Sequence, residues 1–307
     1  MRLYRPMLVA VVALLLAILA AGCGGDDGGG NVTADGSSTV GPYVTSAAED
    51  FQKANEGVTV TVGISGTGGG FERFCLGETD LSNASRPIKD EEVDICAEND
   101  VEYLELQVAN DALTVVVNQA NDWATCLTVE ELNAMWKPGS TVSNWNQVRA
   151  SFPDEPLKLF GPGTDSGTFD YFTGEINGEE GASRTDFSAS EDDNVIVQGV
   201  GGTPGGLGYF GFSYFEENQD TLKAVEIDGG NGCVAPSVES AQAGDYTPLA
   251  RPLFVYANVA SLGRQEVEDF LRYMLENETT IAEQAQFVPL NQQQLDDNLA
   301  KLDEATG

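Results

Sequence analysis

Three glycine- and hydroxyl-rich bends hold the residues in this chain that are best suited to bind a ligand. They span residues 35–42, 65–70 and 161–168. Each precedes a helix-compatible run, and the second and third follow short apolar strands, so the first N–H groups of each helix lack backbone partners. Hydroxyls beside such N–H groups make a cradle for an anion. A single bend is explained equally well by an ordinary helix N-cap, but three predict convergence on one small anion.

The third bend shows this chemistry most fully. The hydroxyls of Ser166 and Thr168 stand at the expected helix start. Gly167 between them lets a ligand approach the backbone closely. Asp165 and Ser166 are also good N-cap residues, so the bend taken alone predicts either an anion contact or a cap.

Arg86 is the candidate cation of the site. It follows Ser85 at the expected carboxyl end of a short strand, and open α/β sheets bind ligands at that edge. A guanidinium can bond two oxygens of a tetrahedral oxyanion. The alternative is a surface arginine paired with a neighbouring carboxylate, which an acidic chain makes easy.

The composition excludes several classes of function. The chain has 307 residues, 49 of them acidic and 15 basic, with a formal net charge of -34. Nucleic-acid binding needs a positive surface and is not expected. The absence of histidine excludes Ser-His-Asp and Cys-His nucleophile schemes and histidine metal sites. We therefore expect no enzyme, no metal and no cofactor, and an anion site that relies on local dipoles and one or two cations.

The N-terminus has the pattern of a bacterial lipoprotein signal peptide. Two arginines precede an apolar run that ends in Ala-Ala-Gly22-Cys23, short for a membrane span but right for a signal-peptide core. Small residues directly before a cysteine predict a signal peptide over 1–22 and lipidation of Cys23. The alternative is a plain secretory signal cut near Gly22. The glycine-rich residues 23–31 predict a flexible tether, so the protein is expected outside the cytoplasmic membrane, anchored to it.

The elements that must position the bends alternate between strand and helix. Residues 32–74 favour a parallel sheet with helices on its faces. Trp136 and Trp145 belong to apolar patterns and are expected in the core. Residues 198–208 look like a phosphate loop, but no Gly-Lys-Ser/Thr follows, so a turn feeding a strand is favoured. The later strands are expected at 111–117, 157–160, 207–212 and 253–256, and the later helices at 128–136, 264–276 and roughly 283–302.

With these motifs the chain resembles the extracytoplasmic phosphate-binding proteins of bacterial ABC phosphate importers. The likeness covers essentially the whole mature chain, and its markers are Gly36–Val40 with Pro42, Ser65–Gly70, Asp80–Pro87, Thr164–Thr168 and Arg251–Tyr256. It implies the class II periplasmic-binding-protein fold: two α/β lobes, two crossing segments near 111–117 and 246–256, and a ligand in the cleft. The implied layout is 32–113 plus 251–307 for lobe 1 and 114–250 for lobe 2.

The resemblance also implies the phosphate contacts. They are Ser38 and Thr39 in the first bend, Thr67 in the second and, across the cleft, Ser166, Gly167 and Thr168 in the third. Ser85 and Arg86 are added as candidates for their place at the strand end, and Gly66 as a possible contact. Two positions depart from the family pattern. Ser85 stands where an acidic acceptor of the phosphate proton is expected, and Pro162 stands where an arginine is expected. Arg86 is the candidate replacement for the cation, and Asp165 for the acceptor.

The missing acceptor bears on selectivity. At neutral pH only phosphate, and not sulfate, still carries a proton to donate, and a carboxylate facing sulfate would meet an unpaired repulsion. If no carboxylate lines the cleft, selectivity against sulfate should therefore be weaker.

Four cysteines remain besides Cys23, namely Cys75, Cys96, Cys126 and Cys233. An even number in an exported chain predicts two disulfides, and the sequence leaves three pairings open. Cys75–Cys96 and Cys126–Cys233 are favoured because each pair then lies within one lobe of the implied layout. Metal binding by four thiolates is the alternative, although the sequence has no CxxC spacing.

These inferences predict a lipid-anchored, monomeric protein that captures inorganic phosphate and hands it to an ABC permease by closing its lobes. A binding or sensing module for another tetrahedral oxyanion is the alternative within the same fold. A phosphatase or serine hydrolase is disfavoured, because the chain lacks histidine and a nucleophile-elbow context.

Overall fold

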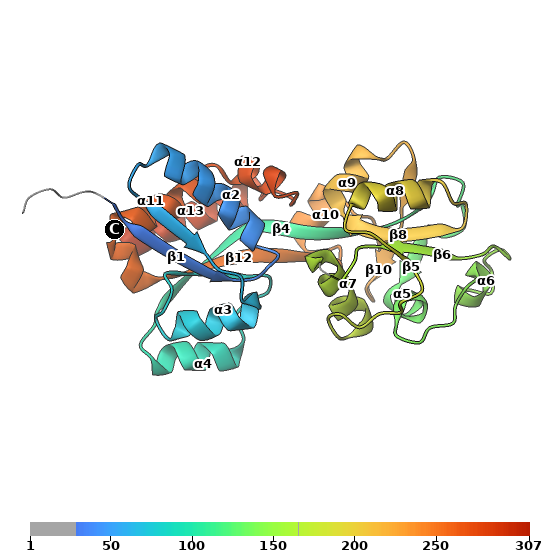
Figure 1. Cartoon of the computed structure of the whole chain (residues 1–307), viewed down its shortest axis with the longest axis horizontal. Helices are drawn as coiled ribbons and strands as arrows, with labels where there is room; N and C mark the ends of the chain where they lie inside the picture. Colours follow the sequence, from blue (N-terminus) through green and yellow to red (C-terminus); the bar gives the residue numbers. More distant parts are fainter. Residues whose placement is uncertain (1–28, 165) are drawn as a thin grey trace, which may run out of the picture.

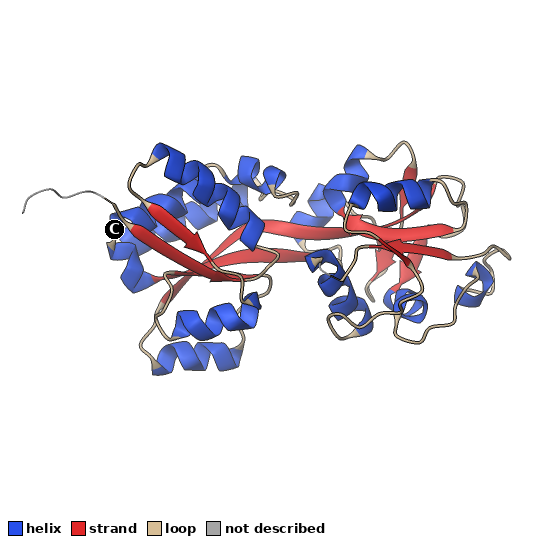
Figure 2. Cartoon of the chain, in the orientation of Figure 1, coloured by secondary structure: helices blue, strands red, loops and turns tan. Residues whose placement is uncertain are grey.

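Two α/β lobes joined by two long strands make up the molecule (Figures 1 and 2). The structure, a computed structural model, describes residues 29–164 and 166–307. The predicted signal peptide, Cys23, most of the predicted tether and Asp165 lie outside the described residues. Among the residues described, no helix has the length and apolar character needed to cross a membrane.

Lobe 1 is a sheet with helices on both faces (Figure 1). Strand β1 runs parallel to β2 and β3, and β12 runs antiparallel to β3 and β4. The expected strand–helix–strand opening is confirmed, with β1 beginning at Asn31, the last residue of the predicted tether. The elements are β1 (Asn31–Gly36), α2 (Gly41–Ala54), β2 (Thr59–Val62), α3 (Gly66–Cys75), β3 (Leu81–Ala84), α4 (Asp90–Glu98), η1 (Val259–Gly263), α11 (Gln265–Glu276), α12 (Glu278–Gln284) and α13 (Gln292–Thr306).

The single helix expected over 283–302 is wrong, because the chain breaks between α12 and α13. Gln286 has a φ of 63°, and Pro289 lacks the N–H that a continuing helix needs. Val288 instead exchanges backbone hydrogen bonds of 2.9 Å with Asn110 of β4. Tertiary pairing thus replaces the helix that local periodicity favours.

Lobe 2 combines a mixed sheet with a smaller one. Strand β6 is parallel to β7 and β8, β8 is antiparallel to β4, and the second sheet has the order β11-β10-β5. In the glycine-rich segment 198–208, residues 198–201 end a helix, 202–205 form the favoured turn, and 206–208 begin β8. The elements are β5 (Cys126–Thr128), α5 (Val129–Trp136), α6 (Trp145–Val148), β6 (Lys158–Gly161), α7 (Gly167–Asn177), β7 (Ser188–Ala189), α8 (Asp193–Gly201), β8 (Gly206–Gly211), α9 (Phe212–Glu217), β9 (Leu222–Ala224), β10 (Glu226–Asp228), β11 (Cys233–Val234) and α10 (Val238–Ala243).

The two crossing segments are β4 (Tyr103–Asn118) and β12 (Ala250–Asn258). They pair antiparallel, and β4 then continues into lobe 2, where residues 113–117 pair with β8. Figure 1 shows the two strands side by side between the lobes. The residue boundaries assigned to the lobes stay predictions.

Each lobe has its own hydrophobic core. In lobe 1, α2 and α11 pack through Phe51 and Phe270, whose ring centroids are 5.3 Å apart. In lobe 2, Trp136 and Trp145 are fully buried, as expected. The two main cores are separate, and a small cluster that includes Phe212 of lobe 2 and Val288 of lobe 1 packs where the lobes meet.

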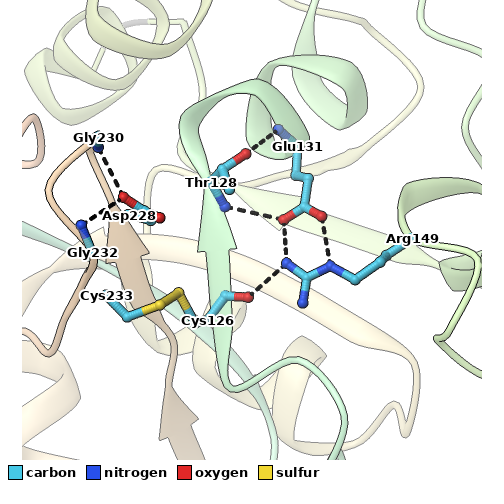
Figure 3. Close-up of a disulfide and its surroundings, with 8 residues drawn as sticks. All are labelled: Cys126, Thr128, Glu131, Arg149, Asp228, Gly230, Gly232 and Cys233. Carbon is cyan, nitrogen blue, oxygen red and sulfur yellow. Dashed lines mark hydrogen bonds and ion pairs between the residues drawn. A yellow bond between two sulfur atoms is a disulfide. The ribbon is translucent and has the colours of Figure 1, made fainter.

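Both favoured disulfides are confirmed. Cys75–Cys96 joins α3 to α4 in lobe 1, and Cys126–Cys233 joins β5 to β11 in lobe 2. Figure 3 shows the second disulfide beside the capping box of α5, in which Thr128 and Glu131 exchange hydrogen bonds of 3.0 and 3.2 Å. Neither disulfide links one lobe to the other, so lobe movement strains neither of them.

Candidate anion-binding site

The first bend follows β1. Gly36 has a φ of 139°, in the region that favours glycine, and a Cβ there would overlap the carbonyl of Asn83. Ser37 donates its N–H to that carbonyl at 2.8 Å, and its hydroxyl accepts the N–H of Thr39 at 3.2 Å. Because Ser37 caps the bend, the side chains of Ser38 and Thr39 are left for the space in front of it.

A buried carboxylate, Asp35, ties the first bend to the second. It accepts the N–H of Gly36 at 2.8 Å and that of Ser65 at 3.1 Å, and it forms an ion pair with Arg73 of α3. Asp35 is only 2% exposed, and a charge so deeply buried needs partners of this kind. One side chain therefore fixes the relative position of two bends.

The second bend differs from the expectation, because α3 already begins at Gly66 instead of at Phe71. Glycines are poor helix formers, but here packing against β1 determines where the helix begins. Gly70 lies so close to β1 that an added Cβ would come 2.5 Å from the Cα of Gly36. Thr67 therefore stands on the first turn of a helix, where its Oγ1 lies 3.1 Å from the Oγ of Ser85.

The third bend leads from β6 into α7. The Ser166 hydroxyl accepts the N–H of Thr168 at 3.2 Å and is the N-cap of the helix. The ring of Phe172 in α7 stacks on that of Tyr209 in β8, with the ring centroids 3.7 Å apart. Such aromatic pairs add about 0.5–1.5 kcal/mol each to stability. The start of α7 is thus held rigidly on lobe 2.

A cavity of about 600 Å³ lies where the three bends meet. On the side of lobe 1 and the crossing strands it is lined by Ser37, Ser38, Thr39, Gly66, Thr67, Gly68, Ser85, Arg86, Pro87, Arg251 and Pro252. On the side of lobe 2 it is lined by Gly167, Asp170, Tyr171, Glu175 and Glu180. The lobes approach closely here, since a Cβ added to Gly167 would lie 3.4 Å from the Oγ1 of Thr39.

Most of the predicted contact residues therefore lie together. Ser38, Thr39, Gly66, Thr67, Ser85, Arg86 and Gly167 line the cavity, whereas the lining described does not include Ser166 or Thr168. Asp165 lies outside the described residues.

Arg86 lines the cavity but is already engaged. Its two terminal nitrogens donate to the two carboxylate oxygens of Glu92 at 2.8 and 2.7 Å. The hydrogen bond to Glu92 raises the pKa of Arg86, which keeps the guanidinium charged. Arg86 is therefore both paired with a neighbouring carboxylate and exposed to the cavity.

Arg251 is a second cation at the cavity, which the sequence analysis did not identify as a site residue. It lies on β12, donates to Asp111 Oδ2 at 3.1 and 3.2 Å, and donates to Thr39 Oγ1 at 3.1 Å. Its guanidinium carbon lies 3.6 Å from the ring centroid of Tyr171. The available signal was the marker Arg251–Tyr256, which predicted only a strand and a crossing segment there.

Three carboxylates face the cavity from lobe 2, and the sequence analysis also missed them. Partial burial raises the pKa of Glu175, an effect that Arg251 opposes and Glu180 reinforces. Partial burial and Glu180 also raise the pKa of Asp170. Weak selectivity against sulfate was expected only for a cleft without carboxylates. This cleft has three, so that condition is not met.

The arrangement is suited to an anion that can also donate a proton. Helix N-termini of both lobes supply donors, together with hydroxyls and two arginines of lobe 1 and the crossing strands, and lobe 2 also adds hydrogen-bond acceptors. The one group of potential metal ligands in the described part of the chain is Cys126, Glu226 and Cys233. Two of these form a disulfide, so their sulfurs are not available as thiolate ligands.

Comparison with known proteins gives a consistent result. The chain matches the PBP superfamily domain over residues 22–278. It is 50% identical over 261 residues to protein SphX of Synechococcus elongatus, covering 84% of this chain and 77% of that protein. It is 38% identical over 308 residues to the phosphate-binding protein PstS of Staphylococcus saprophyticus, covering 98% of this chain and 95% of that protein.

Solved structures agree. A possible phosphate binding protein from Planctomyces limnophilus superposes with a TM-score of 0.87 at 45% identity, covering 91% of this chain and 99% of that one. PstS from Borrelia burgdorferi shares the fold, with a TM-score of 0.68 at 21% identity.

Proposed function

Since the chain belongs to the PBP superfamily and, within it, to the family of the PstS and SphX proteins, we propose that it captures inorganic phosphate outside the cytoplasmic membrane and delivers it to an ABC permease. The protein is a binding protein and not an enzyme. The proposal that phosphate is the ligand is supported by the similarity to phosphate-binding proteins of the PstS type and by the donors at the cavity.

The observation that carries this function is the meeting of three helix-initiating bends on one cavity. Dehydrating phosphate is costly, and only a dense set of N–H and O–H donors offsets that cost. A chain with a net charge of -34 repels anions at long range, so the short-range donors must dominate. Helix N-termini are suited to this role because their N–H groups are fixed before the ligand arrives.

The residues take different roles in this proposal. Ser38, Thr39 and Thr67 donate hydroxyl hydrogen bonds, Ser85 supports Thr67, and the backbone at Gly66 and Gly167 lets the ligand reach the helix ends. Ser166 and Thr168 shape the start of α7, through the cap that Ser166 forms. Arg86 and Arg251 supply positive charge from two sides.

Membrane anchoring through Cys23 and a monomeric state are further parts of the proposal. Strand β1 begins at the end of lobe 1 that is remote from lobe 2 (Figure 1). A tether attached there leaves the cleft between the lobes accessible to phosphate and to a permease. Mass spectrometry of the membrane fraction tests the anchor, with a diacylated Cys23 as the new N-terminus expected.

Calorimetric titration of the purified protein with phosphate tests the function. One phosphate per chain is expected, without turnover of a phosphate ester by the same preparation. Absence of binding at millimolar phosphate, with tight binding of a different tetrahedral oxyanion, would favour the alternative function as a sensing module.

A further inference from the structure

We propose that Arg251 couples phosphate binding to the position of one lobe relative to the other. This inference rests on the proposed function, because it concerns the ligand of the same cavity. It assigns to Arg251 a positioning role that Arg86, the other cavity arginine, does not have.

Arg251 stands where the two lobes are joined. In the pairing of β12 with β4 it lies directly opposite Asp111, and an irregularity in the register follows between Leu253 and Phe254. These two strands are the connection seen between the lobes in Figure 1. A change in the contacts of Arg251 therefore acts at the place where a lobe movement must bend the chain.

The side chain of Arg251 contacts three parts of the molecule at once. It donates to Thr39 in the first bend of lobe 1 and to Asp111 in the connection. Its guanidinium lies on the ring of Tyr171, which belongs to α7 of lobe 2. The Tyr171 hydroxyl in turn donates to the carbonyl of Pro248 at 2.8 Å, so the ring is held beside the start of β12.

Arg251 also has donors left for a ligand. Asp111 accepts through a single oxygen, Oδ2, and Nη1 of Arg251 has no hydrogen-bond partner among the described residues. The side chain is 17% exposed and lines the cavity. An anion bonded to Nη1 would hold the guanidinium plane against Tyr171 and so draw α7 toward Thr39.

Arg86 provides the contrast. Its fork is occupied by both oxygens of Glu92 in the same lobe, and its aromatic neighbour, Phe71 at 5.6 Å, belongs to lobe 1 as well. The hydrogen bonds and the ring contact of Arg86 therefore link a ligand to lobe 1. Of the two cavity arginines, Arg251 is the one that directly contacts both a strand joining the lobes and a residue of lobe 2.

The test measures affinity and lobe movement separately. Spin labels are placed on exposed positions of the two lobes through Lys53→Cys and Val195→Cys, and the distance distribution between them is recorded with and without saturating phosphate. The variants are Arg251→Lys, Arg251→Gln and Tyr171→Leu, and calorimetry gives the phosphate affinity of each. The matched control is Arg149→Lys, because Arg149 also pairs with a carboxylate, Glu131, and lies 4.6 Å from a ring centroid, that of Phe152, away from the cavity.

In the unsubstituted protein phosphate should shift and narrow the distance distribution. Arg251→Gln should lose about 100-fold or more in affinity, and Arg251→Lys about 10-fold, because an ammonium keeps the charge but not the planar fork. With saturating phosphate, the Arg251→Lys and Tyr171→Leu proteins should keep a broader distribution of distances between the spin labels than the unsubstituted protein. The Arg149→Lys protein should show the same narrowed distribution as the unsubstituted protein.

Full narrowing in saturated Arg251→Lys would overturn the coupling, and so would unchanged affinity in Arg251→Gln. Thermal melting without phosphate identifies a variant that fails to fold, in which case Arg251→Lys and Tyr171→Leu decide the outcome. Absence of phosphate binding by the unsubstituted protein would instead contradict the proposed function, so the two failures are distinguishable.

Discussion

The two faces of the cleft are chemically opposite. Lobe 1 presents hydroxyls, two helix N-termini and Arg86, with Arg251 beside them on the crossing strand, whereas lobe 2 presents one helix N-terminus and the carboxylates of Asp170, Glu175 and Glu180. A site built only to attract an anion would not place carboxylates on one wall. In the proposed function, one face supplies the attraction, and the carboxylates of the other face accept a hydrogen bond from the protonated oxygen of phosphate.

The physical reason is the cost of an unpaired acceptor. A protonated phosphate oxygen can donate to a carboxylate, while every oxygen of sulfate at neutral pH meets it as a like charge. The face on lobe 1 treats the two ions alike, because both are tetrahedral and accept hydrogen bonds. Affinity and selectivity should therefore respond to substitutions on different lobes.

After Arg251→Gln, Thr39→Val should give the largest change in affinity. It removes a hydroxyl at the cavity that also accepts from Arg251, and a lost hydrogen bond to a charged group costs about 1.5–3 kcal/mol. Calorimetry should show this loss for phosphate and for any other oxyanion that binds. Thr79 is a buried threonine of lobe 1 outside the cavity, and the Thr79→Val protein should bind phosphate as the unsubstituted protein does. Equal losses of phosphate affinity in both variants would contradict a direct role of the Thr39 hydroxyl in binding.

Glu175→Gln should change selectivity more than affinity. The amide can donate to an unprotonated oxygen, so sulfate should gain roughly 10-fold in affinity relative to phosphate. Glu179→Gln, an exposed neighbour outside the cavity lining, should leave the ratio unchanged. An unaltered phosphate-to-sulfate ratio in Glu175→Gln would show that this residue of lobe 2 does not select.

Arg86→Gln should weaken phosphate binding by about 1 kcal/mol or less, because the ion pair with Glu92 already neutralises much of the charge of Arg86. This effect is well below that expected for Arg251→Gln. Parallel titrations of the two variants check the order. The reverse order would restore Arg86 as the main cation of the site.

Glu278→Gln should leave phosphate binding unchanged and alter only stability. Burial raises the pKa of Glu278 to about 7, while the N–H of Leu290 donates to it at 2.8 Å. The folded state thus retains a proton that the unfolded chain releases near pH 4.5, so unfolding free energy falls as pH rises from about 4.5 to 7. Chemical denaturation at pH 5 and pH 8 should show that the glutamine variant lacks this fall; a parallel fall in both proteins would contradict the assignment.

The sequence predicts the bends well because they are local. Glycines, hydroxyls and the following helical periodicity lie within a few residues of one another, and both capping and anion binding depend on that local order. Arg251 could not be placed in the same way, since its partner Asp111 is 140 residues away in the sequence and meets it only through strand register. The start of α3 at Gly66 likewise depends on close packing of Gly70 against β1.

The carboxylates of α7 represent an intermediate case. Phe169, Phe172 and Ile176 are buried and mark the core face of the helix. Glu175 and Asp170 must then point elsewhere, which the helical spacing can reveal. That they point into a cavity shared with lobe 1 depends on how the two lobes are joined, and no local pattern encodes that arrangement.

A competition titration of phosphate against sulfate tests the division of roles between the lobes most directly. The account predicts that one phosphate binds per chain and that a millimolar excess of sulfate leaves the phosphate isotherm unchanged. Displacement of phosphate by sulfate at comparable concentrations would contradict it, because the carboxylates of lobe 2 would then contribute nothing to the choice of ligand.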